Sequence, residues 1–259
     1  MRKDINFKVY GSEFNTTPLL ICHGLFGSLK NWHSVASHLE KLKKKVILMD
    51  MRNHGNSFWN RFHTYQEMSN DIKLIIDDVG TKVDILGHSM GGKAAMFFAS
   101  ENYDLINKLV VLDISPVTYR DTWSSLLKIL LNINFREIKK RSDFEEILYL
   151  KGFSRDVILF LSQNLIRNEL GLYSLKFNIN AIDISLKDIL SYPKNSNTFY
   201  GEVLFIKGNN SEYINEENFG LSLKIFPNAK LKIIFNSGHW VHIEKKECFL
   251  KVLLEFLEN

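Results

Sequence analysis

Short apolar runs alternate with amphipathic segments along the first part of this chain. Residues 19–22, 46–49, 83–86 and 109–112 are almost all apolar, as in strands that are covered on both faces. Between these runs, apolar residues recur at spacings of three and four, which is the period of an α-helix. Strands that alternate with helices predict an α/β fold with a mainly parallel central sheet flanked by helices.

The alternation stops after the strand that ends near Asp113 and resumes near residue 201. Residues 118–200 contain no clear buried strand, and helical patterns are found at 123–131, 144–148, 157–165 and 182–190. Apolar runs at 203–206 and 231–235 then continue the sheet, and a helical pattern closes the chain. We therefore expect one core built from residues 1–117 and 201–259, with a helical cap (lid) inserted as residues 118–200.

The sequence Gly87-His88-Ser89-Met90-Gly91 lies between a predicted strand and a predicted helix. This is the context of a G-x-S-x-G nucleophile elbow, a sharp turn that presents a serine hydroxyl at the end of a strand. Glycines allow the strand and the helix to approach closely, and the helix N-terminus favours negative charge beside the hydroxyl. The motif arises by chance in roughly one chain in twenty of this length. It therefore indicates a nucleophile only if the chain also supplies a base and an acid for the serine.

Loops after other predicted strands supply the partners that a nucleophilic serine needs. The carboxyl ends of parallel strands meet at one edge of a sheet, so side chains distant in the sequence converge there. Asp113 follows the strand at 109–112, and His239 follows the strand at 231–235. A histidine can take the proton of the Ser89 hydroxyl, and a carboxylate can hold that histidine in the required tautomer. Ser89, Asp113 and His239 are therefore the candidate nucleophile, acid and base.

The chain order of these residues, together with the motifs around them, resembles the serine α/β-hydrolases over essentially the whole sequence. The sequence is most similar to small bacterial esterases of the YbfF type. Motifs at predicted strand ends carry this similarity, and they are residues 23–28, 50–55, 87–93, 113–116 and 238–242. The resemblance implies an oxyanion hole of two backbone N–H groups, one from Met90 and one from Leu25, with Phe26 as an alternative to Leu25.

The position of the acid departs from the wider superfamily, in which it usually follows the next strand. Here that loop reads Asn209-Asn210-Ser211-Glu212 and contains no aspartate. We therefore assign the acid to Asp113, one strand earlier, and keep Glu212 as the alternative.

The resemblance implies a serine esterase that hydrolyses carboxylic esters or acyl thioesters, acyl-CoA among them, through an acyl-enzyme on Ser89. An apolar cap suits an acyl chain, although most of its apolar residues are expected to pack against the core. A methyl esterase acting on an acyl group bound to acyl-carrier protein is the alternative within this class. A hydrolase-like lyase or a ligand-binding protein on the same fold also stays open, although binding alone does not require the three residues.

Composition and charge narrow the partners, cellular compartment and cofactors expected of this protein. The net charge of +4 over 259 residues is below what nucleic-acid binders usually carry, so no nucleic-acid partner is expected. No apolar stretch reaches the ~18 residues that span a bilayer, and the start lacks the apolar region of a signal peptide, so we expect a cytoplasmic protein without a membrane span. Cys22 and Cys248 do not form a disulfide framework. His239 and His242 lack a third ligand of suitable spacing, so neither a metal nor a cofactor is expected.

Overall fold

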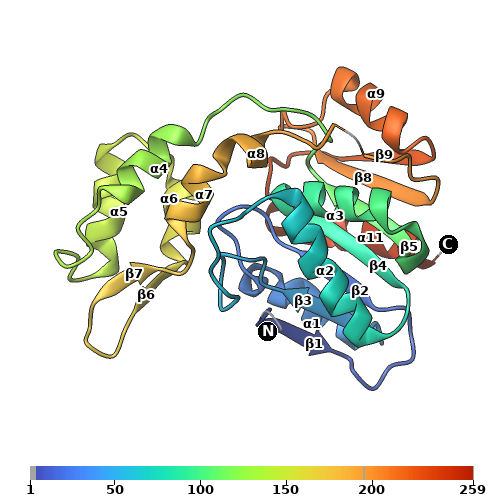
Figure 1. Ribbon diagram of the computed structural model, residues 1–259, viewed down its shortest axis with the longest axis horizontal. Helices are drawn as coiled ribbons and strands as arrows, with labels where there is room; N and C mark the ends of the chain where they lie inside the picture. The colour runs from blue at the N-terminus through green and yellow to red at the C-terminus, as the bar shows by residue number, and fades with distance from the viewer. Residues whose placement is uncertain (1–3, 195, 259) are drawn as a thin grey trace.

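The central sheet of this protein carries all the predicted core strands in one layer (Figure 1). The computed structural model describes residues 4–194 and 196–258. The strand order is β1-β3-β2-β4-β5-β8-β9, and only β1 pairs antiparallel with its neighbour. The strands are β1 (Phe7–Tyr10), β2 (Leu19–Cys22), β3 (Val46–Met49), β4 (Val83–His88), β5 (Ile106–Leu112), β8 (Glu202–Gly208) and β9 (Ala229–Ile234). The expectation of a mainly parallel sheet is confirmed.

Both faces of the sheet are covered by helices, which explains why the inner strands contain continuous apolar runs. Leu109 and Val111 of β5 pack in one core with residues of α2 (Tyr65–Val79) and α3 (Met90–Glu101). Val110 and Leu112 point to the opposite face and pack with residues of α1 (His33–Lys41) and α11 (Lys246–Glu258). Because successive side chains of a strand alternate between faces, consecutive residues from Lys108 to Leu112 are all buried.

Further helices complete the core. They are the 3₁₀ helices η1 (Leu29–Trp32) and η2 (Tyr103–Leu105), α9 (Glu216–Ile225) between the last two strands, and α10 (Val241–Glu244). α10 begins two residues after His239 and directly precedes α11. The polypeptide therefore turns into a helix immediately after the loop that carries His239.

The segment 118–200 lies to one side of the sheet, at the left of Figure 1. Its helices are α4 (Ser124–Leu131), α5 (Arg141–Leu150), α6 (Arg155–Ser162), α7 (Ile179–Ile184) and α8 (Leu186–Leu190). The expectation of helices alone is wrong here, because β6 (Leu165–Arg167) and β7 (Tyr173–Leu175) form an antiparallel hairpin. Strands of three residues are too short to show an alternating pattern, and most of their side chains are not buried.

Backbone hydrogen bonds join this cap segment to the loop after β3. The Gly55 N–H donates to the Lys176 carbonyl at 2.9 Å, and the Asn178 N–H donates to the Asn53 carbonyl at 2.8 Å. His54 and Phe177, which lie between these residues, form an isolated antiparallel bridge. The cap segment is therefore docked on the core through main-chain contacts as well as through its apolar side chains.

A single buried lysine ties both ends of the cap segment to α3. The Lys93 Nζ donates to the carbonyl oxygens of Val117, Leu190 and Ser191, each at 2.8 Å. Val117 lies before the cap helices, whereas Leu190 and Ser191 end the last of them. An ammonium has three N–H groups, so each of them is used. Burial lowers the pKa of Lys93 to about 7.

Candidate active site

Ser89 occupies a strained turn between β4 and α3. Its φ of 54° and ψ of −120° lie outside the regions that side-chain-bearing residues normally adopt. Its N–H donates to the Leu112 carbonyl at 3.1 Å, which fixes the turn to the end of β5. Strain of this kind costs on the order of 1–3 kcal/mol and persists only where the surrounding structure enforces it. The geometry is the one expected of a nucleophile elbow.

Glycines beside Ser89 allow the elbow to contact the loop after β2. A Cβ built on Gly91 would lie 2.4 Å from the carbonyl oxygen of Cys22 and 2.5 Å from that of His23. A Cβ built on Gly87 would lie 2.3 Å from the carbonyl oxygen of Gly91. These atoms belong to the backbone and cannot rotate away, so no side chain fits at either position.

We expect Gly91→Ala to destabilise the fold by about 2 to 3 kcal/mol, because the methyl group would push the two backbone segments apart. Urea unfolding at neutral pH measures this loss. Gly220→Ala is the matched control, since Gly220 lies in α9 and a Cβ built there would meet no atom within 4 Å. That control should raise stability by up to ~1 kcal/mol, as alanine favours helix. Equal stability of Gly91→Ala and the wild type would contradict the close approach.

The structure brings Asp113 and His239 together at the carboxyl edge of the sheet. The His239 Nδ1 donates to the Asp113 Oδ2 at 2.8 Å, and the Gly208 N–H donates to the Asp113 Oδ1 at 3.1 Å. The Asp113 side chain is fully buried, whereas 17% of the His239 side chain is exposed. A buried carboxylate that accepts the Nδ1–H leaves the Nε2 of the imidazole as the nitrogen able to accept a proton.

Glu212, the alternative acid, is placed differently. It is exposed to solvent and lines the wall of the pocket that contains Ser89. Within residues 4–194 and 196–258, Glu212 forms no hydrogen bond or ion pair, and the carboxylate that meets His239 is that of Asp113. The geometry favours Asp113 as the partner of the imidazole.

The backbone N–H groups of Leu25 and Met90 lie beside Ser89 and have no hydrogen-bond acceptor among the described residues. The N–H group of Phe26, the alternative to Leu25, already has an acceptor, because it donates to the His54 Nε2 at 3.1 Å. The loop that carries Leu25 presses against the elbow, since a Cβ built on Gly24 would lie 3.1 Å from the Ser89 Cβ. Unpaired N–H groups in this position can stabilise an oxyanion.

Three other histidines, at positions 23, 88 and 242, lie next to Ser89 and His239 in this site. The His88 Nε2 donates to the His239 carbonyl at 3.0 Å and so holds the histidine loop to the elbow. His242 stacks on Trp32 with ring centroids 4.1 Å apart. Burial lowers the pKa of His88 well below its ordinary value and that of His242 to about 3, so both rings are neutral near pH 7. His23 is also buried, and its Nε2 accepts the Met51 N–H at 3.0 Å.

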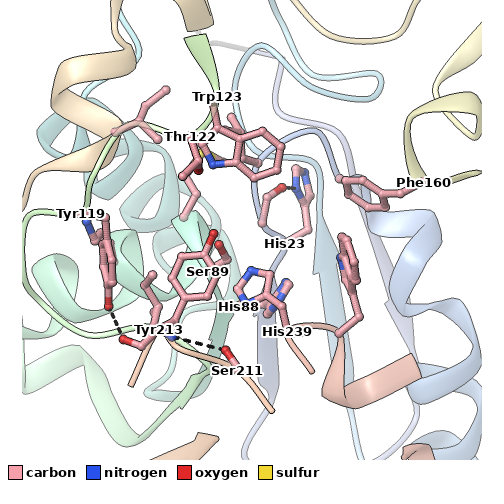
Figure 2. Close-up of a pocket in the computed structure, with 18 of the residues that line it drawn as sticks. His23, His88, Ser89, Tyr119, Thr122, Trp123, Phe160, Ser211, Tyr213 and His239 are labelled. Atoms are coloured by element: carbon pink, nitrogen blue, oxygen red, sulfur yellow. Dashed lines mark hydrogen bonds between the residues drawn. The ribbon is translucent and has the colours of Figure 1, made fainter. Parts of the chain in front are cut away.

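Ser89 and His239 open into a pocket of about 610 Å³, which is the size range of small-molecule sites. Figure 2 shows Trp123 and Phe160 of the cap segment across this pocket from Ser89 and His239. Much of the lining is apolar or aromatic, including Leu25, Ile114, Tyr119, Ile189, Leu190 and Trp240. A substrate in the pocket would therefore contact both the core and the cap segment.

Neither a metal site nor a membrane span is found in the described part of the chain. No group of three or more histidine, cysteine or acidic side chains there could hold a metal ion. No helix within those residues is long and apolar enough to cross a bilayer. Cys22 is buried, Cys248 is exposed, and both are free thiols.

Known proteins resemble this chain over almost its whole length. The sn-1-specific diacylglycerol lipase ABHD11 of Xenopus laevis is 35% identical over 264 residues, which cover 99% of this chain and 84% of the relative. The esterase YbfF of Escherichia coli strain K12 is 31% identical, with 100% of both chains covered. A family model described as the alpha/beta hydrolase fold matches residues 17–134. This chain belongs to the α/β-hydrolase family.

The solved structures agree with this assignment. A marine microorganism esterase of 35% sequence identity superposes with a TM-score of 0.94, covering 98% of this chain and 99% of that one. The expected fold class and the resemblance to esterases are therefore confirmed. Because the relatives are named as esterases and lipases, this α/β-hydrolase is an enzyme of the esterase type.

Several residues of the site of this α/β-hydrolase were missed by sequence reasoning. Glu244 accepts the N–H groups of Gly238 at 2.7 Å and Trp240 at 3.2 Å, and so shapes the loop that carries His239. Ser211 donates a hydrogen bond to Asp113, and Tyr213 stacks on His239. In the sequence, Glu244 offered only a weak indication of this role, because an acidic residue in the first turn of a helix is favoured by the helix dipole. The roles of Ser211 and Tyr213 depend on tertiary contacts and leave no local pattern.

Proposed function

We propose that this α/β-hydrolase is a serine esterase with Ser89 as nucleophile, His239 as base and Asp113 as acid. The observation that carries the proposal is one pocket lined by both the strained Ser89 and His239, whose imidazole is hydrogen-bonded to the buried Asp113. The unpaired N–H groups of Leu25 and Met90 complete the arrangement as the oxyanion hole. A site used only for binding has no need of a strained serine beside a buried acid–base pair.

The proposed reaction proceeds through an acyl-enzyme. The Ser89 Oγ attacks the acyl carbonyl carbon while the Nε2 of His239 takes the hydroxyl proton. The carbonyl oxygen becomes an oxyanion held by the N–H groups of Leu25 and Met90, each worth about 3 kcal/mol. The imidazolium then gives its proton to the departing alcohol as the C–O bond breaks. Water, deprotonated by His239, attacks the acyl group and releases the carboxylic acid and Ser89.

The pocket and the relatives support an ester with an apolar acyl chain as substrate. The apolar lining from the core and the cap segment suits hydrocarbon, and Ile114, Ile189 and Leu190 contribute to it. Relatives that cover nearly the whole chain are named diacylglycerol lipase and esterase. We propose the cap to be residues 118–200 on a core of residues 1–117 and 201–259. Acyl thioesters, free or linked to CoA or a carrier protein, would use the same acyl-enzyme and form the second candidate class.

A chain-length panel of p-nitrophenyl esters, from acetyl to palmitoyl, tests this function beside acyl-CoA thioesters of matched length. We expect kcat/KM for the esters to rise by up to about fourfold per methylene from acetyl to hexanoyl, because each buried methylene contributes ~0.8 kcal/mol. Esters should be cleaved faster than the matched thioesters. Cleavage of thioesters alone would replace the proposal by a thioesterase, and no cleavage of either class would overturn it.

The same assay separates the two acids. Asp113→Asn is expected to lower kcat by about 10³- to 10⁴-fold, because the amide holds the imidazole in the wrong tautomer. Glu212→Gln should change kcat by less than about twofold, since its carboxylate is exposed and does not contact His239. The reverse result would transfer the acid role to Glu212.

A further inference from the structure

The N–H group of Leu25 belongs to a tight turn in the loop after β2. The turn runs from Gly24 to Gly27, and the Gly27 N–H donates to the Gly24 carbonyl at 3.0 Å. Its third residue, Phe26, has a φ of 58°, in the left-handed region that residues other than glycine rarely adopt. Such a conformation persists only where the surrounding structure enforces it. The contacts of Phe26 therefore hold the turn in shape.

Two side chains hold the backbone of Phe26, one from the core and one from the cap segment. The Phe26 N–H donates to the His54 Nε2 at 3.1 Å, and the Phe26 carbonyl accepts a hydrogen bond from the Asn164 Nδ2 at 2.6 Å. The Phe26 ring is fully buried, and its centroid lies 5.4 Å from that of Trp123 and 4.9 Å from that of Phe177. The cap segment therefore contacts this residue through both its carbonyl and its ring.

Asn164 is itself held in place between α6 and β6. Its side chain is buried, its N–H donates to the Leu161 carbonyl at 2.9 Å, and its carbonyl accepts the Lys176 N–H at 2.8 Å. The Lys176 carbonyl in turn accepts the Gly55 N–H from the loop after β3. The amide of Asn164 is therefore fixed with respect to the core as well as within the cap segment.

Two planar peptide units connect the Asn164 amide with the Leu25 N–H. The first unit contains the Phe26 carbonyl, which accepts from Asn164, and the Gly27 N–H. The second unit contains the Gly24 carbonyl, which accepts that Gly27 N–H, and the N–H of Leu25. In a trans peptide the carbonyl and the N–H point in opposite directions. The hydrogen bond that holds the Gly24 carbonyl therefore also sets the direction of the Leu25 N–H.

We propose that Asn164 of the cap segment is a positioning residue of the oxyanion hole, whose amide fixes the turn after β2 and thereby the direction of the Leu25 N–H. This inference rests on the proposed function, in which Leu25 supplies one of the two oxyanion donors. A donor stabilises the oxyanion only when it points to the place where the charge develops. The cap segment therefore contributes to the chemical step as well as to the substrate pocket.

The test compares kcat and KM of the wild type with those of Asn164→Leu, which has a side chain of similar size and no N–H donor. We expect kcat for p-nitrophenyl hexanoate to fall by about tenfold to a hundredfold, because a misdirected donor loses most of its hold on the oxyanion. KM should change by less than about twofold, since Asn164 lies outside the lining of the pocket.

An alkyl trifluoromethyl ketone measures the oxyanion hole directly. The Ser89 Oγ bonds to its carbonyl carbon, the hydroxyl proton passes to His239, and the carbonyl oxygen becomes an oxyanion in the hole. The inhibition constant of this ketone should rise in Asn164→Leu by the factor by which kcat/KM falls. The corresponding alcohol cannot be attacked, so its inhibition constant should change by less than about twofold.

Gln163→Met is the matched control. The Gln163 Oε1 accepts a hydrogen bond from the Asn31 Nδ2 at 3.0 Å, so this neighbour of Asn164 makes another contact between the cap segment and the loop after β2. Its loss should leave kcat and both inhibition constants unchanged. An equal loss of kcat in Gln163→Met would assign the effect to a loosened cap segment and overturn the inference.

A rise in KM at unchanged kcat in Asn164→Leu would also overturn the inference, because it would place Asn164 in substrate binding alone. Asn164→Ala removes the donor without adding bulk, and it decides the outcome if thermal unfolding shows that Asn164→Leu is not folded. Ser89→Ala separates the two levels. If Ser89→Ala keeps full activity, the proposed function fails. If it is inactive while the folded Asn164 variants keep the wild-type kcat, only this inference fails.

Discussion

Ser89→Ala is expected to lower kcat for ester hydrolysis by about 10⁴- to 10⁶-fold, because it removes the hydroxyl that we propose forms the acyl-enzyme. The residual rate would come from the oxyanion hole and from substrate binding alone. Substrate binding should change little, since the alanine removes one hydroxyl and leaves the pocket lining unchanged. The strained backbone at Ser89 is kept by the surrounding glycines, so the variant should fold.

A fluorophosphonate probe checks the same assignment without a substrate. The wild type should gain one covalent label, and Ser89→Ala should gain none. Ser162→Ala is a suitable control, because that hydroxyl is buried in α6 without a hydrogen-bond partner among the described residues. The control should label and hydrolyse as the wild type does. Wild-type hydrolysis by Ser89→Ala would exclude Ser89 as the nucleophile.

Acid is expected to unfold this protein between about pH 6 and pH 4, because several histidines are buried in the neutral form. Burial lowers the pKa of His63 and His242 to about 3 and that of His54 and His88 well below the ordinary value of 6.5. His54 shows why: its Nδ1–H donates to the Arg52 carbonyl, and its Nε2 accepts a backbone N–H. A second proton on that Nε2 would break the latter bond.

The direction of this pH dependence follows from how many protons the folded and the unfolded protein bind. Below pH 6.5 the unfolded chain takes up protons on these histidines, whereas the folded protein does not until the pH approaches 3. Stability is therefore complete above pH 6.5 and is lost as the pH falls below that value. At pH 4.5 each of His63 and His242 costs roughly 2 to 3 kcal/mol. The cost at these two residues alone is a large part of the roughly 5–15 kcal/mol that holds a typical domain folded, and His54 and His88 act in the same direction.

Urea unfolding at pH 7.5, 6.0 and 5.0 measures this dependence. His242→Phe keeps the stacking on Trp32 and removes a titrating ring whose Nδ1 has no hydrogen-bond partner among the described residues. Its free energy of unfolding should fall less steeply with pH than that of the wild type. His38→Gln, a change at a half-buried position on α1, should keep the wild-type slope. A wild-type stability that is constant from pH 7.5 to 5.0 would refute the prediction.

A feature could be predicted from the sequence when the residues that produce it lie close together along the chain. The elbow and the ends of β4, β5 and β9 were predictable because apolar runs, glycines and polar residues follow one another within a few positions. The hairpin of β6 and β7 was not, because strands of three residues carry no period. The last predicted cap helix is divided into α7 and α8 at Ser185. This break was not predictable either, because no glycine or proline lies there.

Contacts between distant residues account for the rest. The sequence left Leu25 and Phe26 open as the second oxyanion donor, and only the position of His54 shows that the Phe26 N–H is already used. The loop after β8 lacks the usual aspartate, yet its Ser211 reaches the acid from the neighbouring strand. Such pairings depend on which strands lie side by side, and the order of strands in a sheet is not a local property of the chain.

The bonds of Lys93 have a consequence for how this enzyme could be re-engineered. Its ammonium donates to backbone carbonyls, at Val117 on one side of the cap segment and at Leu190 and Ser191 on the other, and it lies over the ring of Tyr119. Among the side chains between these junctions, Tyr119 belongs to the anchor beside the elbow because its ring contacts the ammonium. A foreign cap grafted between Val117 and Leu190 would keep all three acceptors, whereas a graft that removes them would leave a buried ammonium without partners. The junctions are natural crossover points for building hydrolases of new substrate range.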